Sequence, residues 1–131
     1  MAEVEHLAFA NPSSPHWAGR DARILLEDSR EKLAQALGTK PQEIFFTSGG
    51  SESNNTVLRQ LLMTSGEKHI ISSSVEHPSV LETCRILAEQ QNIQFTELAV
   101  DSSGTLAPDD LSAAIRPETE LISLISANNE T

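Results

Sequence analysis

The sequence is short of basic residues: nine Lys and Arg stand against 19 Asp and Glu in 131 residues, for a formal net charge of −10. Proteins that bind nucleic acid present a basic surface to the phosphates, so this imbalance argues against a nucleic-acid partner. The same charge argues against attachment to an anionic membrane surface. The excess acid by itself indicates no more than a well-solvated surface.

Long apolar runs and a second cysteine are also missing. No apolar run approaches the roughly 20 residues that span a bilayer, and the N-terminal MAEVEHLAFA has no basic region before its apolar residues, so we expect no signal peptide. The single cysteine, Cys84, excludes an internal disulfide and favours a reducing, cytoplasmic location. His6, His16 and His69 are scattered and form no metal-ligand spacing with that cysteine, so we expect no metal site.

Segments with helical and strand periodicity alternate along the rest of the chain. The predicted helices are Ala22–Leu37, which ends at Gly38, then Val57–Leu62, Val80–Ala88 and one that starts at Pro108. Short apolar runs predict four strands: Ile44–Thr47, Ile70–Val75, Phe95–Val100 and Leu121–Ala127. Such alternation is typical of βαβ units, so we expect one α/β domain over residues 1–131, with a mostly parallel sheet and helices on both faces.

Polar clusters follow three of the four predicted strands directly. In open parallel sheets, ligands bind beyond the carboxyl ends of the strands, so clusters at these positions are expected to share one rim of the sheet. The three clusters are Ser48–Ser51, Glu76–Pro78 and Asn128–Thr131.

The first cluster places two glycines at a predicted strand-to-helix turn. Glycines there let backbone N–H groups face a ligand without side-chain obstruction, and the start of a helix attracts anions. Gly50 and Ser51 are therefore candidates for a phosphate cradle. The residues alone equally allow a structural turn in which Ser51 caps the helix. The stretch is not a Walker loop because it has no lysine, and it lacks the full G-x-G-x-x-G fingerprint.

The other two clusters contain a histidine and paired amides. Pro78 suits the first helical position, which places His77 at or beside the helix cap. The positive end of a helix disfavours an imidazolium, and a neutral ring there can stack on a ligand or exchange protons. The spacing alone favours a plainer interpretation, a partly exposed histidine after a strand. Asn128 and Asn129 can hold hydroxyls or carboxylates, or simply make a turn, and Cys84 is expected in the core.

Four stretches resemble, in order and spacing, the NifS/IscS-type cysteine desulfurases of the class V aminotransferase family: NPSSPHWAGRDA, EIFFTSGGSESNN, EHPSV and ISANNET. The resemblance runs from about Phe9 to Thr131. It implies part of the large domain of pyridoxal phosphate fold type I, with pyridoxal 5′-phosphate as cofactor and L-cysteine as substrate. It also implies a homodimer, and a sulfur-acceptor or iron–sulfur scaffold protein as partner.

The resemblance also assigns roles and an order of strands. It implies that Gly50 and Ser51 hold the cofactor phosphate, that His77 stacks on the pyridine ring and assists proton transfer, and that Asn129 lies near the ring hydroxyl and the substrate. In the family, the strand matching Ile44–Thr47 lies at one edge of the sheet. The strands matching the other three lie together near the other edge.

The sequence departs from the family at both ends. It lacks the N-terminal LDNAATTP-like segment and everything after the NNET motif. In the family, that later part holds the aspartate facing the pyridine nitrogen, the Schiff-base lysine and the cysteine that takes the sulfur. None of Lys32, Lys40 and Lys68 stands at the family's lysine motif. We therefore expect a fragment or truncated form of a cysteine desulfurase that is inactive alone, and whether the chain itself is an enzyme stays open.

Three alternatives remain from the sequence. One is another class V enzyme, such as an aminotransferase, lyase or epimerase, that shares this half of the site. The second is a non-catalytic remnant that acts as a binding or regulatory module. The third is an unrelated phosphate-binding α/β domain, which the match of four motifs in order disfavours.

Overall fold

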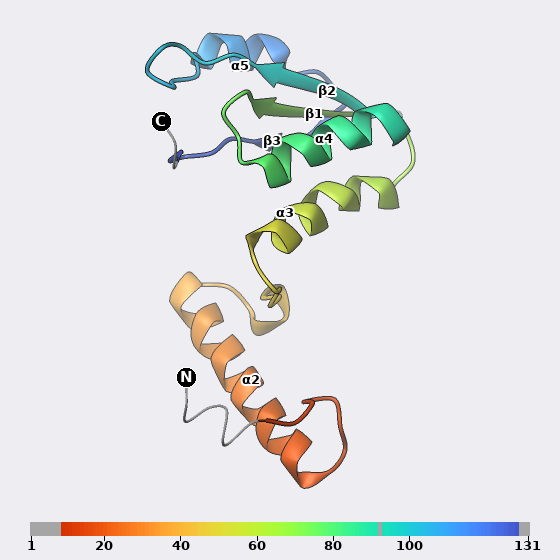
Figure 1. Ribbon diagram of the computed structural model, residues 1–131, viewed down its shortest axis with the longest axis vertical. Helices are drawn as coiled ribbons and strands as arrows, with labels where there is room; N and C mark the ends of the chain where they lie inside the picture. Colours follow the sequence, from red (N-terminus) through yellow and green to blue (C-terminus); the bar gives the residue numbers. More distant parts are fainter. Residues whose placement is uncertain (1–8, 92, 129–131) are drawn as a thin grey trace. The chain divides into compact units, whose positions relative to one another are not determined.

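The structure is a computed structural model that describes residues 9–91 and 93–128 (Figure 1). The chain falls into two compact units, one ending at Phe46 and the other beginning at Thr47. Within the described ranges, no helix is long and apolar enough to cross a membrane. The same residues contain no group of three His, Cys, Asp or Glu side chains arranged to hold a metal ion.

The first unit is built around one long helix, α2, which spans Trp17–Leu37. The helix begins after His16, whose ring accepts a hydrogen bond from the N–H of Gly19 at 3.4 Å. Position 19 requires glycine because a Cβ there would lie 2.4 Å from the carbonyl oxygen of Ser14. The helix ends at Gly38, which has the left-handed conformation (φ 67°), so the end predicted from the sequence is confirmed.

The predicted strand at Ile44–Thr47 is wrong. After the 3₁₀ turn η1 (Pro41–Glu43), this segment is irregular and pairs with no strand among the described residues. The guanidinium of Arg30 donates a hydrogen bond to the carbonyl of Ile44 and lies 5.1 Å from the centroid of the Phe46 ring. The apolar run indicated β structure, but a strand forms only where a neighbour pairs with its backbone.

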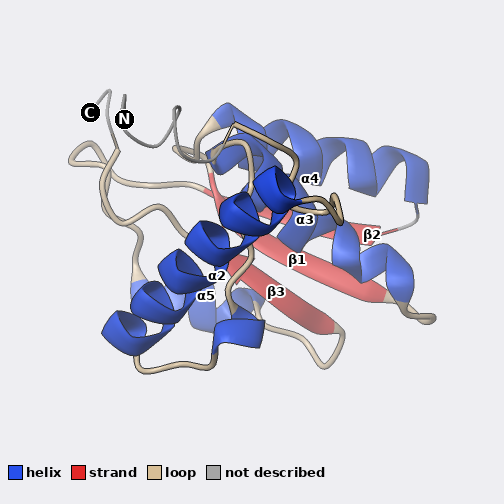
Figure 2. Ribbon diagram, turned by 90° about the horizontal axis from the view of Figure 1, so that it is seen from below, coloured by secondary structure: helices blue, strands red, loops and turns tan. Residues whose placement is uncertain are grey.

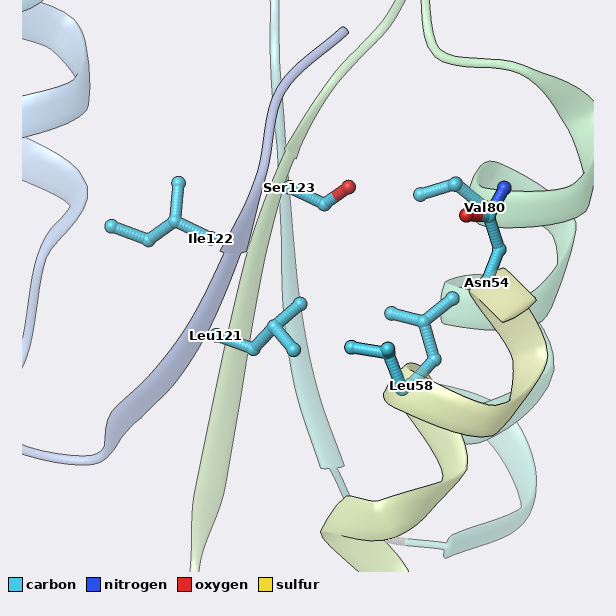
Figure 3. A pocket seen from close by; sticks show the side chains of 7 residues that line it. Asn54, Leu58, Val80, Leu121, Ile122 and Ser123 are labelled. Atoms are coloured by element: carbon cyan, nitrogen blue, oxygen red, sulfur yellow. The ribbon is translucent and has the colours of Figure 1, made fainter. Parts of the chain in front are cut away.

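The second unit is an α/β structure with a three-stranded parallel sheet (Figure 2). The central strand β1 (Lys68–Ser73) lies between β2 (Ile93–Leu98) and β3 (Thr119–Ser123). The helical segments are α3 (Gly50–Arg59), the 3₁₀ helix η2 (Gln60–Met63), α4 (Pro78–Gln91) and α5 (Pro108–Ala114). Figure 3 shows α3 and α4 on one side of the strands and α5 on the other. The predicted α/β fold and the grouping of the three later strands are confirmed.

The core lies between β1 and the helices α3 and α4. All six residues of β1 are buried. Ile70 belongs to a cluster with side chains from the helices and β2: Leu58, Leu61, Val80, Cys84, Leu87 and Ile93. Cys84 is fully buried, as predicted, and burial together with the charge of Glu76 raises the pKa of its thiol to about 11. The thiol therefore stays protonated at neutral pH and is a packing group, not a nucleophile.

A buried histidine joins the three strands. The ring of His69 on β1 lies between the hydroxyls of Thr96 on β2 and Thr119 on β3, with 2.8 Å between each hydroxyl oxygen and the nearer ring nitrogen. Burial lowers the pKa of His69, and the nearby Arg116 charge lowers it further. The neutral ring is therefore part of the structure of the sheet.

Candidate cofactor-binding site

A small cavity of about 140 Å³ lies between the later part of α3, the start of α4 and the end of β3 (Figure 3). Its lining residues are Asn54, Val57, Leu58, Val80, Leu121, Ile122 and Ser123. Figure 3 shows Leu121 and Ser123 pointing toward the two helices, while Ile122 points to the opposite side of the sheet. Ligand pockets commonly measure about 300–1,000 Å³, so this cavity is too small to be a complete ligand pocket, and none of Gly50, Ser51 and His77 lines it.

Hydrogen bonds join the polar cluster after β1 to the one after β3. The side-chain amide of Asn128 donates to the carbonyl of Val75 at 2.6 Å. The carboxylate of Glu76 accepts from the N–H of Ile125 and, at 3.2 Å, from the hydroxyl of Ser73. These two clusters therefore share one rim, as expected from the ends of parallel strands. Asn129, assigned by resemblance to the ring hydroxyl and substrate, lies outside the described residues.

The glycines of the first cluster face open space. Helix α3 begins at Gly50, and its cap, Gly49, has extended backbone with φ 167°. Neither glycine has the left-handed conformation, and a Cβ added to either would meet no atom within 4 Å. Neither the turn nor the internal packing therefore requires glycine here. A ligand that approaches the backbone does require it, because a Cβ would keep an anion away from the N–H groups at the helix start.

Ser51 lies in the first turn of α3 and not at its cap, so the capping interpretation of its hydroxyl is wrong. Glu52 makes the contact across the helix start instead, because its Oε2 accepts from both the N–H and the hydroxyl of Ser48, each at 2.6 Å. These two hydrogen bonds lower the pKa of the Glu52 carboxyl. No described residue hydrogen-bonds to the hydroxyl of Ser51, which leaves it available to a ligand at the helix start.

His77 caps α4, as its position before Pro78 predicts. Its carbonyl accepts from the N–H of Leu81 at 3.2 Å, and its ring Nδ1 accepts from the N–H of Ser79 at 3.1 Å. Because Nδ1 accepts, the proton of the neutral ring is on Nε2. The ring is exposed, so Nε2 is available to donate to or exchange a proton with a bound molecule.

Polar side chains also connect α3 to α4, and sequence reasoning missed them. The amide Nδ2 of Asn54 donates to the hydroxyl of Ser79 at 2.8 Å. One residue further along α3, the side-chain Oδ1 of Asn55 accepts a hydrogen bond from the hydroxyl of Thr83 at 3.2 Å. Both asparagines follow Ser51 by about one helical turn, and this spacing is only a weak sequence signal that they contact a neighbouring helix. Their contacts depend on how two helices pack, which the local sequence does not specify.

The chain matches a known protein family over almost its whole length. The model of the family described as aminotransferase class-V matches residues 2–131. The chain therefore belongs to the class V aminotransferase family, and this agrees with its parallel sheet and with the rim on which its polar clusters lie.

The relatives within that family include cysteine desulfurases. The chain is 51% identical over 125 residues to the cysteine desulfurase IscS of Dictyoglomus turgidum, covering 93% of this chain and 31% of the relative. It is 40% identical over 151 residues to human selenocysteine lyase, of which it covers 34%. Among solved structures, SspA in complex with cysteine has a TM-score of 0.85 and 38% identity, covering 97% of this chain and 37% of that one. The chain thus spans about a third of the length of the curated relatives that it matches.

Proposed function

We propose that the chain forms the phosphate-binding and ring-facing wall of a pyridoxal 5′-phosphate site in a cysteine desulfurase. The reaction converts L-cysteine to L-alanine and passes the sulfur to an enzyme cysteine as a persulfide, for iron–sulfur cluster or thio-cofactor synthesis. The observation that carries the proposal is the open glycine turn at the start of α3, which Asn54, one helical turn further along, links to the start of α4 that His77 caps. The 51% identity to a cysteine desulfurase supports the choice of reaction.

The proposed roles of Gly50, Ser51 and His77 each have a physical basis. The backbone N–H groups of Gly50 and Ser51, with the Ser51 hydroxyl, would hold the phosphate at the positive end of α3. His77 would stack on the pyridine ring and move a proton through Nε2. Asn129 is proposed to lie near the ring hydroxyl and the substrate. When bound, pyridoxal 5′-phosphate supplies the electron sink for bond changes at the substrate carbons.

The surroundings of Lys68 and Cys84 support the proposal that the chain is inactive alone. Lys68 lies at the start of β1, the end of the strand away from the rim, and its ammonium donates to the carbonyls of Leu61 and Thr64. It is therefore held as a structural group and is not free to form a Schiff base. Cys84, buried and protonated, cannot accept sulfur.

Several finer points belong to the same proposal. Residues 1–131 would be part of a larger domain, acting as a cytoplasmic homodimer that delivers sulfur to an acceptor or scaffold protein. The similarity to human selenocysteine lyase supports a second candidate, a class V lyase that acts on the selenium analogue of cysteine. A non-catalytic binding module is the remaining alternative.

A chimera tests the function directly. The matching segment of the Dictyoglomus turgidum cysteine desulfurase is replaced by this chain, and alanine and sulfide are measured with L-cysteine as substrate. We expect turnover close to that of the parent enzyme, and loss of it when His77 is replaced by alanine in the chimera. A folded chimera that binds pyridoxal 5′-phosphate but releases selenium from selenocysteine and no sulfur from cysteine would favour the lyase.

A further inference from the structure

We propose that Asn54 and Ser79 are positioning residues that fix the ring of His77 through a short relay of hydrogen bonds from α3. Asn54 Nδ2 donates to Ser79 Oγ at 2.8 Å, and Ser79 Oγ lies 2.8 Å from His77 Nδ1. The relay joins the helix that begins with the open glycines to the helix that His77 caps. The hydrogen bonds of the relay do not depend on the proposed function. Only the identity of the ligand that the His77 ring would face rests on it.

The direction of each hydrogen bond follows from the donors present. The N–H of Ser79 donates to His77 Nδ1 at 3.1 Å, so Nδ1 carries a lone pair and no proton. The Ser79 hydroxyl accepts from Asn54, which leaves its single hydrogen free to donate to the same Nδ1. The backbone N–H and the hydroxyl of Ser79 therefore share the single lone pair of Nδ1, and Nε2 carries the proton of the neutral ring.

The relay matters because His77 is exposed while Asn54 and Ser79 are partly buried. An exposed side chain ordinarily samples several rotamers, and one backbone hydrogen bond restrains the ring less than two hydrogen bonds do. The second hydrogen bond from Ser79, itself held by Asn54, restricts the ring to one orientation. Asn54 also lines the cavity at the end of β3 (Figure 3), so the relay connects that cavity to the His77 ring.

Solution NMR of the full 131-residue chain with labelled histidine tests the relay without any cofactor. Ring ¹⁵N shifts report which nitrogen carries the proton, and three-bond couplings to Cγ report the χ1 rotamers of His77. We expect a single rotamer with an unprotonated Nδ1 in the neutral wild-type ring. Rotamer averaging of His77 in the wild type, whether in a folded or an unfolded chain, would overturn the proposal.

Matched variants separate positioning from general stability. Ser79→Ala removes the relay hydroxyl, and Asn54→Asp keeps the shape but removes the donor; both should lose the single-rotamer couplings. Ser79→Thr should restore them. Ser112→Ala is the control, because it removes a serine hydroxyl whose one hydrogen bond to a described residue is to the carbonyl of Pro108 in α5, and it should change nothing at His77.

The buried ring of His69 in the same unit serves as the internal marker of folding. If Ser79→Ala also changes the ring ¹⁵N shifts of His69, that variant has disturbed the fold, and the isosteric Asn54→Asp variant becomes the deciding test of the relay. Unchanged His77 couplings in Asn54→Asp, or an equal change in Ser112→Ala, would overturn the inference. Neither result bears on whether the chain binds a phosphate cofactor, so failure of the relay and failure of the proposed function are distinguishable.

Discussion

Replacing Gly50 by alanine should separate a ligand-binding glycine from a structural one. A Cβ at position 50 meets no atom within 4 Å, and the residue begins a helix with no positive φ. Alanine should therefore leave the fold intact and stabilise it by about 0.4–1 kcal/mol, because it restricts the unfolded chain. The same Cβ would obstruct an anion at the backbone. Losing one hydrogen bond to a charged group costs about 1.5–3 kcal/mol, which corresponds to about 10- to 150-fold weaker binding.

The assay pairs urea denaturation with calorimetric titration of pyridoxine 5′-phosphate, which has no aldehyde and so cannot react with surface lysines. Gly66→Ala is the matched control, since Gly66 has φ 111° and precedes β1. That variant should lose about 1–2 kcal/mol of stability from backbone strain and keep its affinity. Wild-type affinity in Gly50→Ala would refute the phosphate cradle. A loss of stability in Gly50→Ala similar to that in Gly66→Ala would show that the glycine is structural.

Three further predictions concern activity and pH. The purified chain, given L-cysteine and pyridoxal 5′-phosphate, should form no alanine or sulfide above the free-cofactor background; turnover that survives substitution of each lysine would sink this. In the chimera, His77→Ala should lower turnover about 100-fold or more while costing only about 1 kcal/mol of unfolding free energy as a lost cap; normal turnover would contradict the assigned role. Because the pKa of His69 is lowered in the folded state, the unfolded chain binds the extra proton. The stability that neutral His69 contributes should be full above the unfolded pKa of about 6.5 and be lost as pH falls from there through the folded pKa. The free energy of unfolding measured in urea should fall between pH 8 and 5, and His69→Gln should make that fall smaller. An equal fall in the variant would show that other groups cause it.

The sequence predicted well where local patterns decide the structure. Gly38 ends α2, Pro78 and His77 start α4, and three apolar runs form parallel strands, because each of these depends on residues close together in the chain. The run at Ile44–Thr47 failed because pairing needs a partner strand, and apolar periodicity carries no information about partners.

The site shows the same division between local and long-range determinants. The glycines at the start of α3 and His77 at the cap of α4 were predictable from turn and helix-start signals. The contacts of Asn54 with Ser79 and of Asn128 with Val75 were not, since each joins residues at least 25 positions apart in the chain. The alternative in which Ser51 caps the helix was wrong, since Ser51 lies within the first turn, because the sequence does not fix a helix start to the residue.

An amide map of phosphate binding tests the central claim most directly. ¹⁵N-labelled chain is titrated with pyridoxine 5′-phosphate and, in parallel, with pyridoxine, and the backbone amide shifts are followed. We predict saturable shifts at Gly50 and Ser51 with the phosphate ester, a ring-dependent shift at His77, and much weaker effects with pyridoxine. Equal responses to both compounds, or shifts confined to residues away from the starts of α3 and α4, would contradict the claim that this chain forms a wall of a pyridoxal phosphate site.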